Sequence, residues 1–157
     1  MTEKMSIWGV GPVLAAITFP YGLVAVLLGF LWPEWFTLPE IPQVYGTAAG
    51  VVLLAVCLLL YVPTVRAIDR AHGSDRLVTT GVYGACRHPL YSLWILLLLP
   101  AVACLLRSWL FLTASLVMYL AVRFLVRREE QYLEERFGGE YADYKRRVNA
   151  VFPTFWR

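Results

Sequence analysis

Charged residues are scarce in this sequence: Asp, Glu, Lys and Arg make up 16% of its 157 residues. Soluble domains carry closer to about a quarter. Long apolar runs take the place of the missing charge, and runs of this length predict membrane-spanning helices. Because no stretch of domain size remains outside them, we expect a single all-α polytopic membrane domain over residues 1–157.

Features that would indicate several other functions are also missing. None of the three cysteines, Cys57, Cys86 and Cys104, stands in a CxxC pair, so we expect neither a metal site nor a disulfide. No nucleic-acid-binding pattern accompanies the net charge of +3, which we interpret as a basic collar that faces the membrane surface. The first two apolar runs contain no acidic or basic residue, which disfavours a channel or carrier.

Four apolar runs are predicted to be transmembrane, at residues 7–32, 44–62, 90–106 and 109–126. The last two are each about 17 residues long, or roughly 26 Å of helix, which is near the lower limit for a span. Only Arg107-Ser108-Trp109 separates them, so we expect a tight helical hairpin followed by a tail over residues 127–157. Gly46 and Gly50 in the second run have the G-x-x-x-G spacing that is typical of close helix packing.

The basic residues predict how these spans are oriented. The loop between the first two spans carries two glutamates and no lysine or arginine, and the turn between the last two carries only Arg107. The other basic residues lie in the N-terminal tail, in the middle loop from Arg66 to Arg87, or from Arg123 onward. The positive-inside rule therefore predicts that both termini, the middle loop and the tail are cytoplasmic.

Polar residues suited to chemistry gather in two segments on that side, and the later one covers residues 123–153. The fourth span is expected to continue through it as a helix as far as Gly138-Gly139, which suits a C-cap. A shorter helix is predicted over about residues 140–148, with Tyr141 and Tyr144 on one face. The tail is thus expected to be a helical segment beside the membrane.

The four glutamates of this later segment have different expected environments. Glu134 and Glu135 fit a solvated helix face that pairs with neighbouring arginines. Glu129 and Glu130 lie within two turns of the last membrane-embedded residues, where a carboxylate is costly unless it meets a cation or a hydroxyl-rich ligand. This second pair is therefore the candidate for a binding site.

The earlier polar segment, residues 75–92, has a matching character. Pro89 suits the first turn of the third span, and His88 before it should be extended rather than helical. Arg87 and His88 then lie at a helix N-terminus, where free N–H groups and the helix dipole favour an anion. The alternative is that Arg87 reaches toward lipid phosphate and that Tyr91 is an interfacial aromatic anchor.

The two segments read GVYGACRHPLY and, some 37 residues later, EEQYLEERFGGEYADY. They resemble the G-x-Y-x-x-x-R-H-P-x-Y loop and the E-E-x-x-L-x-x-x-F-G-x-x-Y-x-x-Y helix of the isoprenylcysteine carboxyl methyltransferase and phospholipid methyltransferase group of integral membrane enzymes. The resemblance covers about half of the chain, from Leu77 onward. The matching residues are Gly81, Tyr83, Arg87, His88, Pro89, Tyr91, Glu129, Glu130, Leu133, Phe137, Gly138, Tyr141, Tyr144 and Pro153.

The resemblance implies a methyltransferase that binds S-adenosylmethionine on the cytoplasmic side and admits its acceptor through a lipid-facing tunnel. It implies that Arg87 or His88 holds the methionine carboxylate, and that Glu129 or Glu130 accepts from the ribose hydroxyls or the amino group. The tyrosines are expected to surround the adenine or the sulfonium. The residues so implied are, as catalytic, His88, Glu130 and Arg87, and, as cofactor-binding, Tyr83, Arg87, His88, Pro89, Tyr91, Glu129, Glu130, Tyr141 and Tyr144.

Two other functions remain as alternatives. An NADPH-dependent membrane lipid or sterol reductase is one, since some such enzymes share a related C-terminal architecture. A non-enzymatic membrane scaffold, whose basic tail binds anionic lipid, is the other. Within the methyltransferase hypothesis the acceptor is open, because prenylcysteine, phosphatidylethanolamine, an isoprenoid quinone precursor and a small thiol all suit an apolar tunnel. The sequence indicates no oligomeric state.

Overall fold

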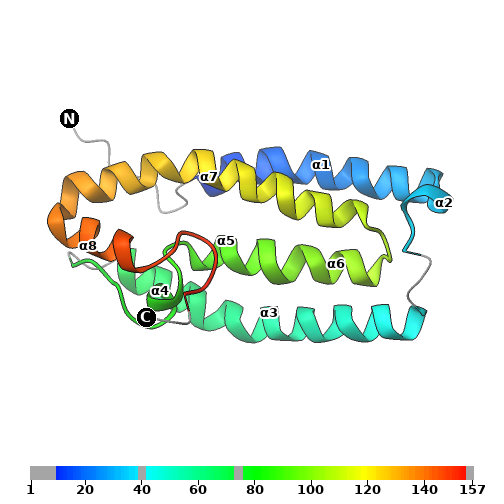
Figure 1. Ribbon diagram of the computed structural model, residues 1–157, viewed down its shortest axis with the longest axis horizontal. Coiled ribbons are helices and arrows are strands. Elements are labelled where there is room, and N and C mark those ends of the chain that lie inside the picture. Colours follow the sequence, from blue (N-terminus) through cyan, green and yellow to red (C-terminus); the bar gives the residue numbers. More distant parts are fainter. Residues whose placement is uncertain (1–9, 39–41, 73–75, 155–157) are drawn as a thin grey trace.

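The computed structural model describes residues 10–38, 42–72 and 76–154, and these form a bundle of helices (Figure 1). Three helices are long and apolar enough to cross a membrane: α1 (Gly11–Leu31), α3 (Gln43–His72) and α7 (Leu110–Phe137). The chain is therefore an all-α membrane protein, as the apolar runs predict.

A shorter apolar helix, Pro89–Leu105, completes the bundle. It consists of α5 (Pro89–Leu93), the π-helical turn η1 (Trp94–Leu98) and α6 (Leu99–Leu105). The remaining helices are α2 (Pro33–Phe36), α4 (Val82–Ala85) and α8 (Gly139–Arg147).

The long helices lie side by side along the long axis of the molecule (Figure 1). α1 packs against α7, and α6 packs against both α3 and α7. The shorter helix therefore lies between α3 and the pair formed by α1 and α7. Helix α8 and α4 lie at one end of the bundle, and α2 lies at the other.

Several predicted boundaries are confirmed. The hairpin turn falls between Leu105 and Leu110, with Arg107 at a φ of 51°. α7 continues without a break to Phe137, where Gly138 follows at a φ of 54°, a conformation that glycine adopts with little strain. α8 corresponds to the short helix predicted for the tail. The first predicted span begins at residue 7, and its first three residues lie outside the described ones.

The second span differs from its prediction, because α3 continues ten residues past the predicted end at Val62. The extra turns are rich in arginine and alanine, which favour helix, and no glycine or proline interrupts the chain between Pro63 and Gly73. The Nε group of Arg70 also donates to the Arg66 carbonyl at 3.1 Å. Hydropathy marks where the apolar surface ends, and the helix itself ends later.

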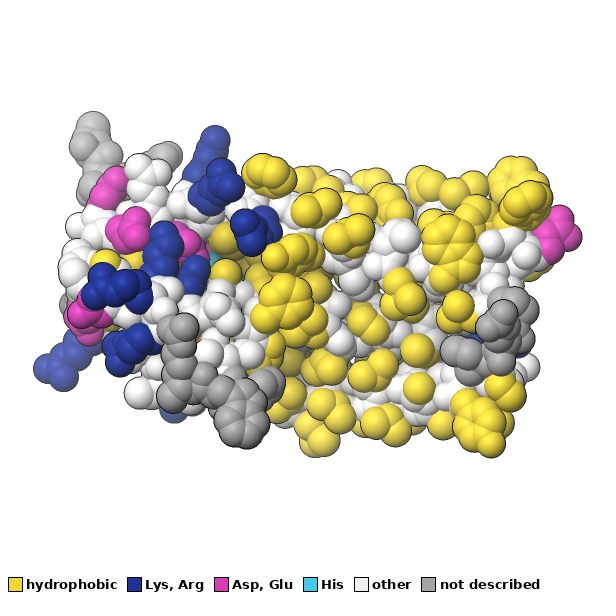
Figure 2. Space-filling view, in the orientation of Figure 1, with side chains coloured by type: hydrophobic (Ala, Val, Ile, Leu, Met, Phe, Trp, Pro, Cys, Tyr) yellow, Lys and Arg dark blue, Asp and Glu magenta, His cyan; other side chains and the backbone are white. Residues whose placement is uncertain are grey.

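Side chains sort along the bundle by polarity (Figure 2). Apolar side chains cover the middle and the α2 end, and large ones such as Phe19 and Leu59 are about three-quarters exposed, at 74% and 75%. This is the surface expected of helices in lipid. Charged side chains gather at the end that holds α8. The two polar segments of the sequence therefore lie at the same end of the bundle.

The G-x-x-x-G spacing marks the contact between α3 and α6. A Cβ atom at Gly50 would lie 2.7 Å from Cγ of Leu105 and 3.0 Å from the carbonyl oxygen of Ala101. A Cβ atom at Gly46 would meet only ordinary contacts, the nearest at 3.5 Å. The packing interpretation of this spacing is confirmed, and Gly50 carries it.

Candidate functional site

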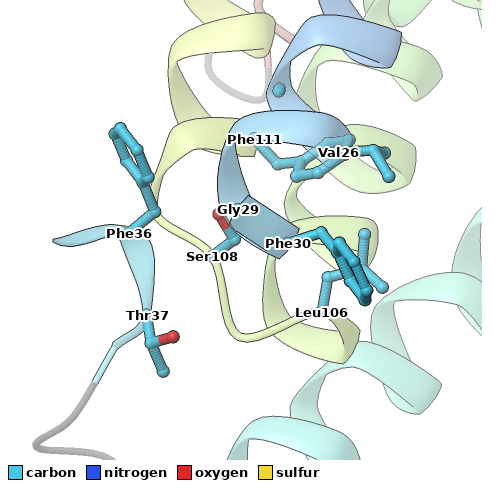
Figure 3. A pocket seen from close by; sticks show the side chains of 9 residues that line it. Val26, Gly29, Phe30, Phe36, Thr37, Leu106, Ser108 and Phe111 are labelled. Atoms are coloured by element: carbon cyan, nitrogen blue, oxygen red, sulfur yellow. The ribbon is translucent and has the colours of Figure 1, made fainter. Parts of the chain in front are cut away.

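A small pocket lies at the α2 end of the bundle and encloses about 220 Å³ (Figure 3). Its walls include Gly29, Phe30 and Phe111. Among the described residues that line it, only Thr37 and Ser108 carry polar side chains, and none is charged. This pocket lacks the groups that a charged ligand requires.

The opposite end, beside α8, contains a buried ion pair between Arg87 and Glu130. Nη2 and Nε of Arg87 lie 2.5 and 3.0 Å from Oε1 of Glu130, and the two side chains are 10% and 9% exposed. Nζ of Lys145 lies 3.1 Å from the other oxygen, Oε2. A carboxylate removed from water needs such partners, because desolvation of an unpaired charge is costly. Arg87 and Lys145 compensate Glu130 from two different elements.

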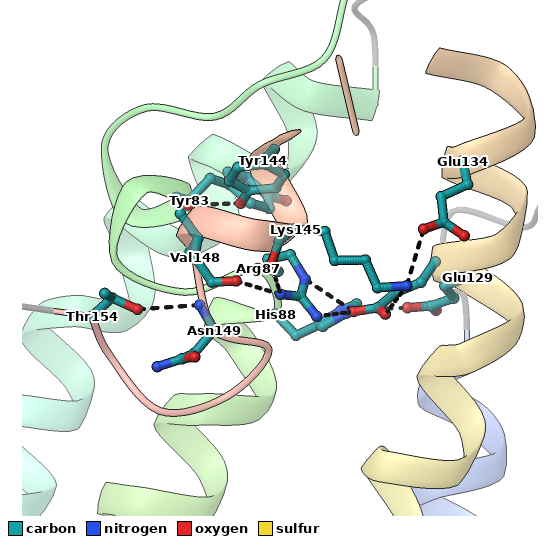
Figure 4. Close-up of polar contacts among 11 residues, drawn as sticks. Tyr83, Arg87, His88, Glu129, Glu134, Tyr144, Lys145, Val148, Asn149 and Thr154 are labelled. Carbon is teal, nitrogen blue, oxygen red and sulfur yellow. Dashed lines mark hydrogen bonds and ion pairs between the residues drawn. The ribbon is translucent and has the colours of Figure 1, made fainter. Parts of the chain in front are cut away.

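The imidazole of His88 lies between the two glutamates. Its Nδ1 is 3.6 Å from Oε2 of Glu129, and its Nε2 is 3.5 Å from Oε1 of Glu130 (Figure 4). These distances are too long for good hydrogen bonds. Within the described part of the chain, Nε2 of His88 has no hydrogen-bond partner although it is buried. The ring is thus held close to both carboxylates without being bonded to Glu130.

The C-terminal segment, residues 148–154, holds the Arg87–His88 backbone in place (Figure 4). The N–H groups of Arg87 and His88 donate to the carbonyls of Asn149 and Ala150, both at 2.9 Å. The guanidinium of Arg87 also donates to the carbonyl of Val148, in the same segment. Residues about 60 positions apart are joined in this way, so the tail is part of the site rather than an appendage.

The loop that carries Arg87 and His88, here called the site loop, becomes a helix at Pro89, and the local sequence explains why. Pro89 occupies the first position of α5, where its missing N–H leaves no bond unmade, and His88 before it is non-helical with a φ of −122°. Four residues later, Oγ of Ser92 donates to the carbonyl of Val151 at 2.5 Å. Pro89 is buried and shapes the backbone, and its side chain carries no polar atom.

The predicted tyrosines line the surroundings of this cluster. Tyr91 stacks on His88 with ring centroids 5.9 Å apart. Tyr141 packs edge-on against Tyr144, and the Tyr144 hydroxyl donates to the Tyr83 carbonyl at 2.6 Å. The Tyr141 side chain is 1% exposed, and its hydroxyl has no hydrogen-bond partner within the described residues. The structure therefore brings all four tyrosines to the α8 end.

The phenols near the cluster are protonated at neutral pH, as tyrosines ordinarily are, and burial raises their pKa further. Burial, and to a lesser degree the charge of Glu129, raises the pKa of Tyr83 to about 12. Burial likewise raises the pKa of Tyr141 and of Tyr144. Near neutral pH each tyrosine is therefore a neutral hydroxyl that can donate a hydrogen bond.

Two contacts of this candidate site were not predicted from the sequence. Lys145 pairs with Glu130, and its position four residues after Tyr141 puts both on one face of α8, which could have indicated it. The backbone N–H of Val10 donates to Oε1 of Glu129 at 2.8 Å, and a backbone group gives no sequence signal. Glu134 is on the solvated face as predicted, and Lys145 is its partner at 3.1 Å.

A largely apolar groove of about 440 Å³ lies between α1, α7 and the helix that begins at Pro89. Aromatic side chains link it to the polar cluster, the group formed by Arg87, His88, Glu129, Glu130 and Lys145. One wall is α1 from Leu14 to Val26, and the others come from Trp94–Leu99 and from α7. Leu14 belongs to the same buried cluster as Tyr91, and the Tyr91 and Trp94 rings lie 6.3 Å apart. Since Tyr91 stacks on His88, apolar contacts continue from the groove to the polar cluster.

Comparison with known proteins adds the following. The sequence profile of the phospholipid methyltransferase family matches residues 46–140. Protein-S-isoprenylcysteine O-methyltransferase of Mus musculus is 29% identical over 134 residues, which cover 81% of this chain and 46% of that protein. The enzyme of the same name from Rattus norvegicus is 36% identical over 125 residues, or 73% and 44% of the two chains.

A bacterial relative is similar over a shorter stretch. The cobalt-zinc-cadmium resistance protein CzcN of Cupriavidus metallidurans is 38% identical over 82 residues, which cover 51% of this chain and 37% of that protein. The chain thus spans less than half the length of each of these curated relatives.

Proposed function

Because the chain belongs to the phospholipid methyltransferase family, we propose that it transfers a methyl group from S-adenosylmethionine to a lipophilic acceptor at the cytoplasmic face of the membrane. One observation carries this proposal: Arg87, His88, Glu129 and Glu130 come together at one end of the bundle, and the rings of Tyr91 and Trp94 connect His88 to an apolar groove. A polar site for a water-soluble donor and an apolar site for a lipid acceptor are thus connected.

The polar cluster fits such a donor. S-adenosylmethionine, when bound, supplies the methyl group from a sulfonium, and it also carries an amino acid, a ribose and an adenine. Nε2 of His88 and the hydroxyl of Tyr141 are buried and without a hydrogen-bond partner in the described part of the chain. Buried polar atoms are seldom left in this state, so both are suited to a polar ligand.

Charge suggests a role for each side chain of the cluster. Arg87 and Lys145 are cations on two sides of one carboxylate, and they suit the carboxylate of the methionine moiety. Glu130 accepts from the amino group or from hydroxyls. His88 lies between the two glutamates, and its Nε2 has no hydrogen-bond partner among the described residues. The tyrosines surround the cluster as aromatic walls, and the Tyr141 hydroxyl suits a hydrogen bond to the ligand.

The groove suits the hydrocarbon chain of the acceptor. Its lining is apolar, and its contacts lead through Trp94 and Tyr91 to His88. An acceptor whose chain lies in the groove would therefore present its polar head at the cluster. The matching acceptors are of the isoprenylcysteine-carboxylate or phospholipid-headgroup type, in line with the names of the family and of its two mammalian relatives.

Methyl transfer makes few demands on acid–base chemistry. Alignment of the reacting groups and exclusion of water supply much of the acceleration, and the apolar helices around the cluster exclude water. An ionised carboxylate acceptor needs no base. An amine acceptor must lose a proton. We assign His88 to take it, because its buried Nε2 has no hydrogen-bond partner in the part of the chain that the structure describes.

Two measurements on the purified protein test this function. S-adenosylhomocysteine should raise the melting temperature, and NADPH should not. Labelled methyl groups should then pass from S-adenosylmethionine into a total lipid extract. Stabilisation by NADPH alone would support the reductase, and no stabilisation by either ligand would support the scaffold. Either result would overturn the methyltransferase assignment.

A further inference from the structure

The first membrane helix begins without a cap of its own. Val10 is the N-cap residue of α1, and its apolar side chain accepts no hydrogen bond. The first turn contains no acidic residue. The positive end of the helix dipole and the free N–H groups are therefore not compensated from within α1.

Glu129 supplies this compensation from α7. Its Oε1 accepts the backbone N–H of Val10 at 2.8 Å, across 119 positions of sequence. In a capping box the backbone N–H of the N-cap residue likewise donates to a side-chain carboxylate, but that carboxylate belongs to a glutamate of the same helix. Here a glutamate of another helix makes it, and its charge also faces the positive end of the α1 dipole.

The other oxygen of Glu129 faces the polar cluster, since Oε2 lies 3.6 Å from Nδ1 of His88. One carboxylate thus connects the start of α1 to the site loop. Glu130 differs, because its oxygens face Arg87 and Lys145. The two adjacent glutamates therefore have separate partners.

The connection matters because α1 forms one wall of the apolar groove. Leu14 lies one turn from Val10 and is fully buried, with 0% exposed, in the cluster that also contains Tyr91. The wall continues along α1 as far as Val26. Moving the start of α1 would therefore change both the groove and its approach to His88.

From this geometry we propose that Glu129 is a positioning residue, which fixes α1 against the site loop and so sets the acceptor groove, while Glu130 binds the donor. This inference rests on the proposed function. It assigns Glu130 to the methyl donor and Glu129 to the methyl acceptor. The carboxylate of Glu129 acts on the acceptor through α1.

Two variants and three readouts test the division. Glu129→Gln keeps an oxygen that can accept from Val10, and Glu129→Ala does not. Hydrogen exchange at the Val10 amide reports the bond itself. Titration with S-adenosylhomocysteine reports donor affinity, and methylation of S-farnesylcysteine gives kcat and KM for an acceptor.

We expect Glu129→Ala to speed exchange at Val10 and to raise KM for S-farnesylcysteine about tenfold, the scale of one lost charge-assisted hydrogen bond. Its affinity for S-adenosylhomocysteine should stay within about twofold of wild type, because Glu130 keeps its contacts with Arg87 and Lys145. Glu129→Gln should restore both the protection of Val10 and the KM. A purely structural role would lower donor affinity and kcat together.

The inference is overturned if Glu129→Gln loses donor affinity as Glu130→Gln does, because the charge of Glu129 would then serve the donor. It is also overturned if Val10 exchanges freely in the wild type. Should Glu129→Ala not fold, the affinity of Glu129→Gln for S-adenosylhomocysteine, compared with that of wild type, still decides whether the charge of Glu129 serves the donor. A wild type that binds no S-adenosylhomocysteine but protects Val10 through Glu129 contradicts the proposed function and leaves the helix contact standing.

Discussion

The two ends of the helix bundle use arginine in different ways. At the α2 end, Nη2 of Arg107 donates to the carbonyl of Leu38 at 3.1 Å, and the Leu38 N–H donates back to the Arg107 carbonyl at 2.8 Å. These bonds join two loops through neutral backbone groups. At the α8 end, Arg87 meets the carboxylate of Glu130 in a buried setting.

The difference indicates where binding belongs. Burying a carboxylate with its cations costs desolvation that apolar packing would avoid, so such a cluster contributes little to stability for its cost. It does provide fixed charges, which the residues lining the pocket at the α2 end lack. We therefore assign binding to the α8 end and loop closure to the α2 end.

The largest expected effect follows from removing the charge of Glu130. Glu130→Gln keeps the size of the side chain, and we expect affinity for S-adenosylhomocysteine to fall about 10- to 100-fold, the scale of a lost charge-assisted hydrogen bond. Glu135→Gln, on the exposed face of the same helix, is the matched control and should bind normally. Isothermal titration compares the two. Equal affinities would remove Glu130 from the site.

A narrower groove should affect the acceptor and spare the donor. A Cβ atom at Gly22 would meet nothing within 4 Å, so Gly22→Leu can fold and place its side chain in the groove. We expect KM for S-farnesylcysteine to rise about tenfold, the equivalent of about two displaced methylene groups. Gly22→Ala should have a smaller effect. A KM that does not change with side-chain size would place the acceptor elsewhere.

Packing in the membrane can be weakened without touching the polar cluster. Gly50→Ala forces a Cβ into 2.7 Å of Leu105, and such overpacking costs about 1–3 kcal/mol. Gly46→Ala has the same gain in helix propensity and no close contact, so it is the control. Thermal unfolding should show a lower Tm for Gly50→Ala than for Gly46→Ala, with normal donor binding in both. Equal Tm values would contradict the close α3–α6 contact.

The smallest effect concerns Lys145 and pH. Burial lowers the pKa of this amine, but hydrogen bonds to Glu134 and Glu130 outweigh it and raise the pKa above its ordinary value. The stabilisation is then complete below the unfolded pKa and is lost as pH rises through the folded pKa. Because the Lys145 side chain is 37% exposed, we expect it to add less than about 1 kcal/mol to the free energy of unfolding.

Thermal unfolding of wild type and Lys145→Met between about pH 9 and 12 measures this contribution, in the range around the ordinary pKa of lysine. The difference in Tm should shrink at the alkaline end. A difference that grows with pH would reverse the sign of the assigned shift.

Much of the fold could be predicted because hydropathy and capping act locally. α7 ends at Gly138 because glycine adopts a positive φ with little strain, and α5 starts at Pro89 because proline suits the first position of a helix. The end of α3 could not be predicted from hydropathy, because the helix continues into polar sequence beyond Val62. Periodicity and apolar content mark the membrane, whereas helix ends depend on caps and on packing.

The site was only partly predictable for a different reason. Motif residues such as Arg87 and Glu130 carry charges whose cost in lipid marks them in the sequence. Their pairing, and the part that Lys145 plays, depend on how α8 folds back against α7. The bond from Val10 to Glu129 uses a backbone N–H, which every residue except proline possesses. Such a contact appears only when the helices are placed.

The central claim is that the α8 end binds the methyl donor. An experimental structure of the protein with S-adenosylhomocysteine tests it most directly. We predict that the ligand contacts Arg87 and Glu130 and approaches Tyr91, whose ring lies between His88 and the groove residue Trp94. A ligand bound in the pocket at Ser108, or an intact Arg87–Glu130 cluster with the ligand bound away from it, would contradict the account.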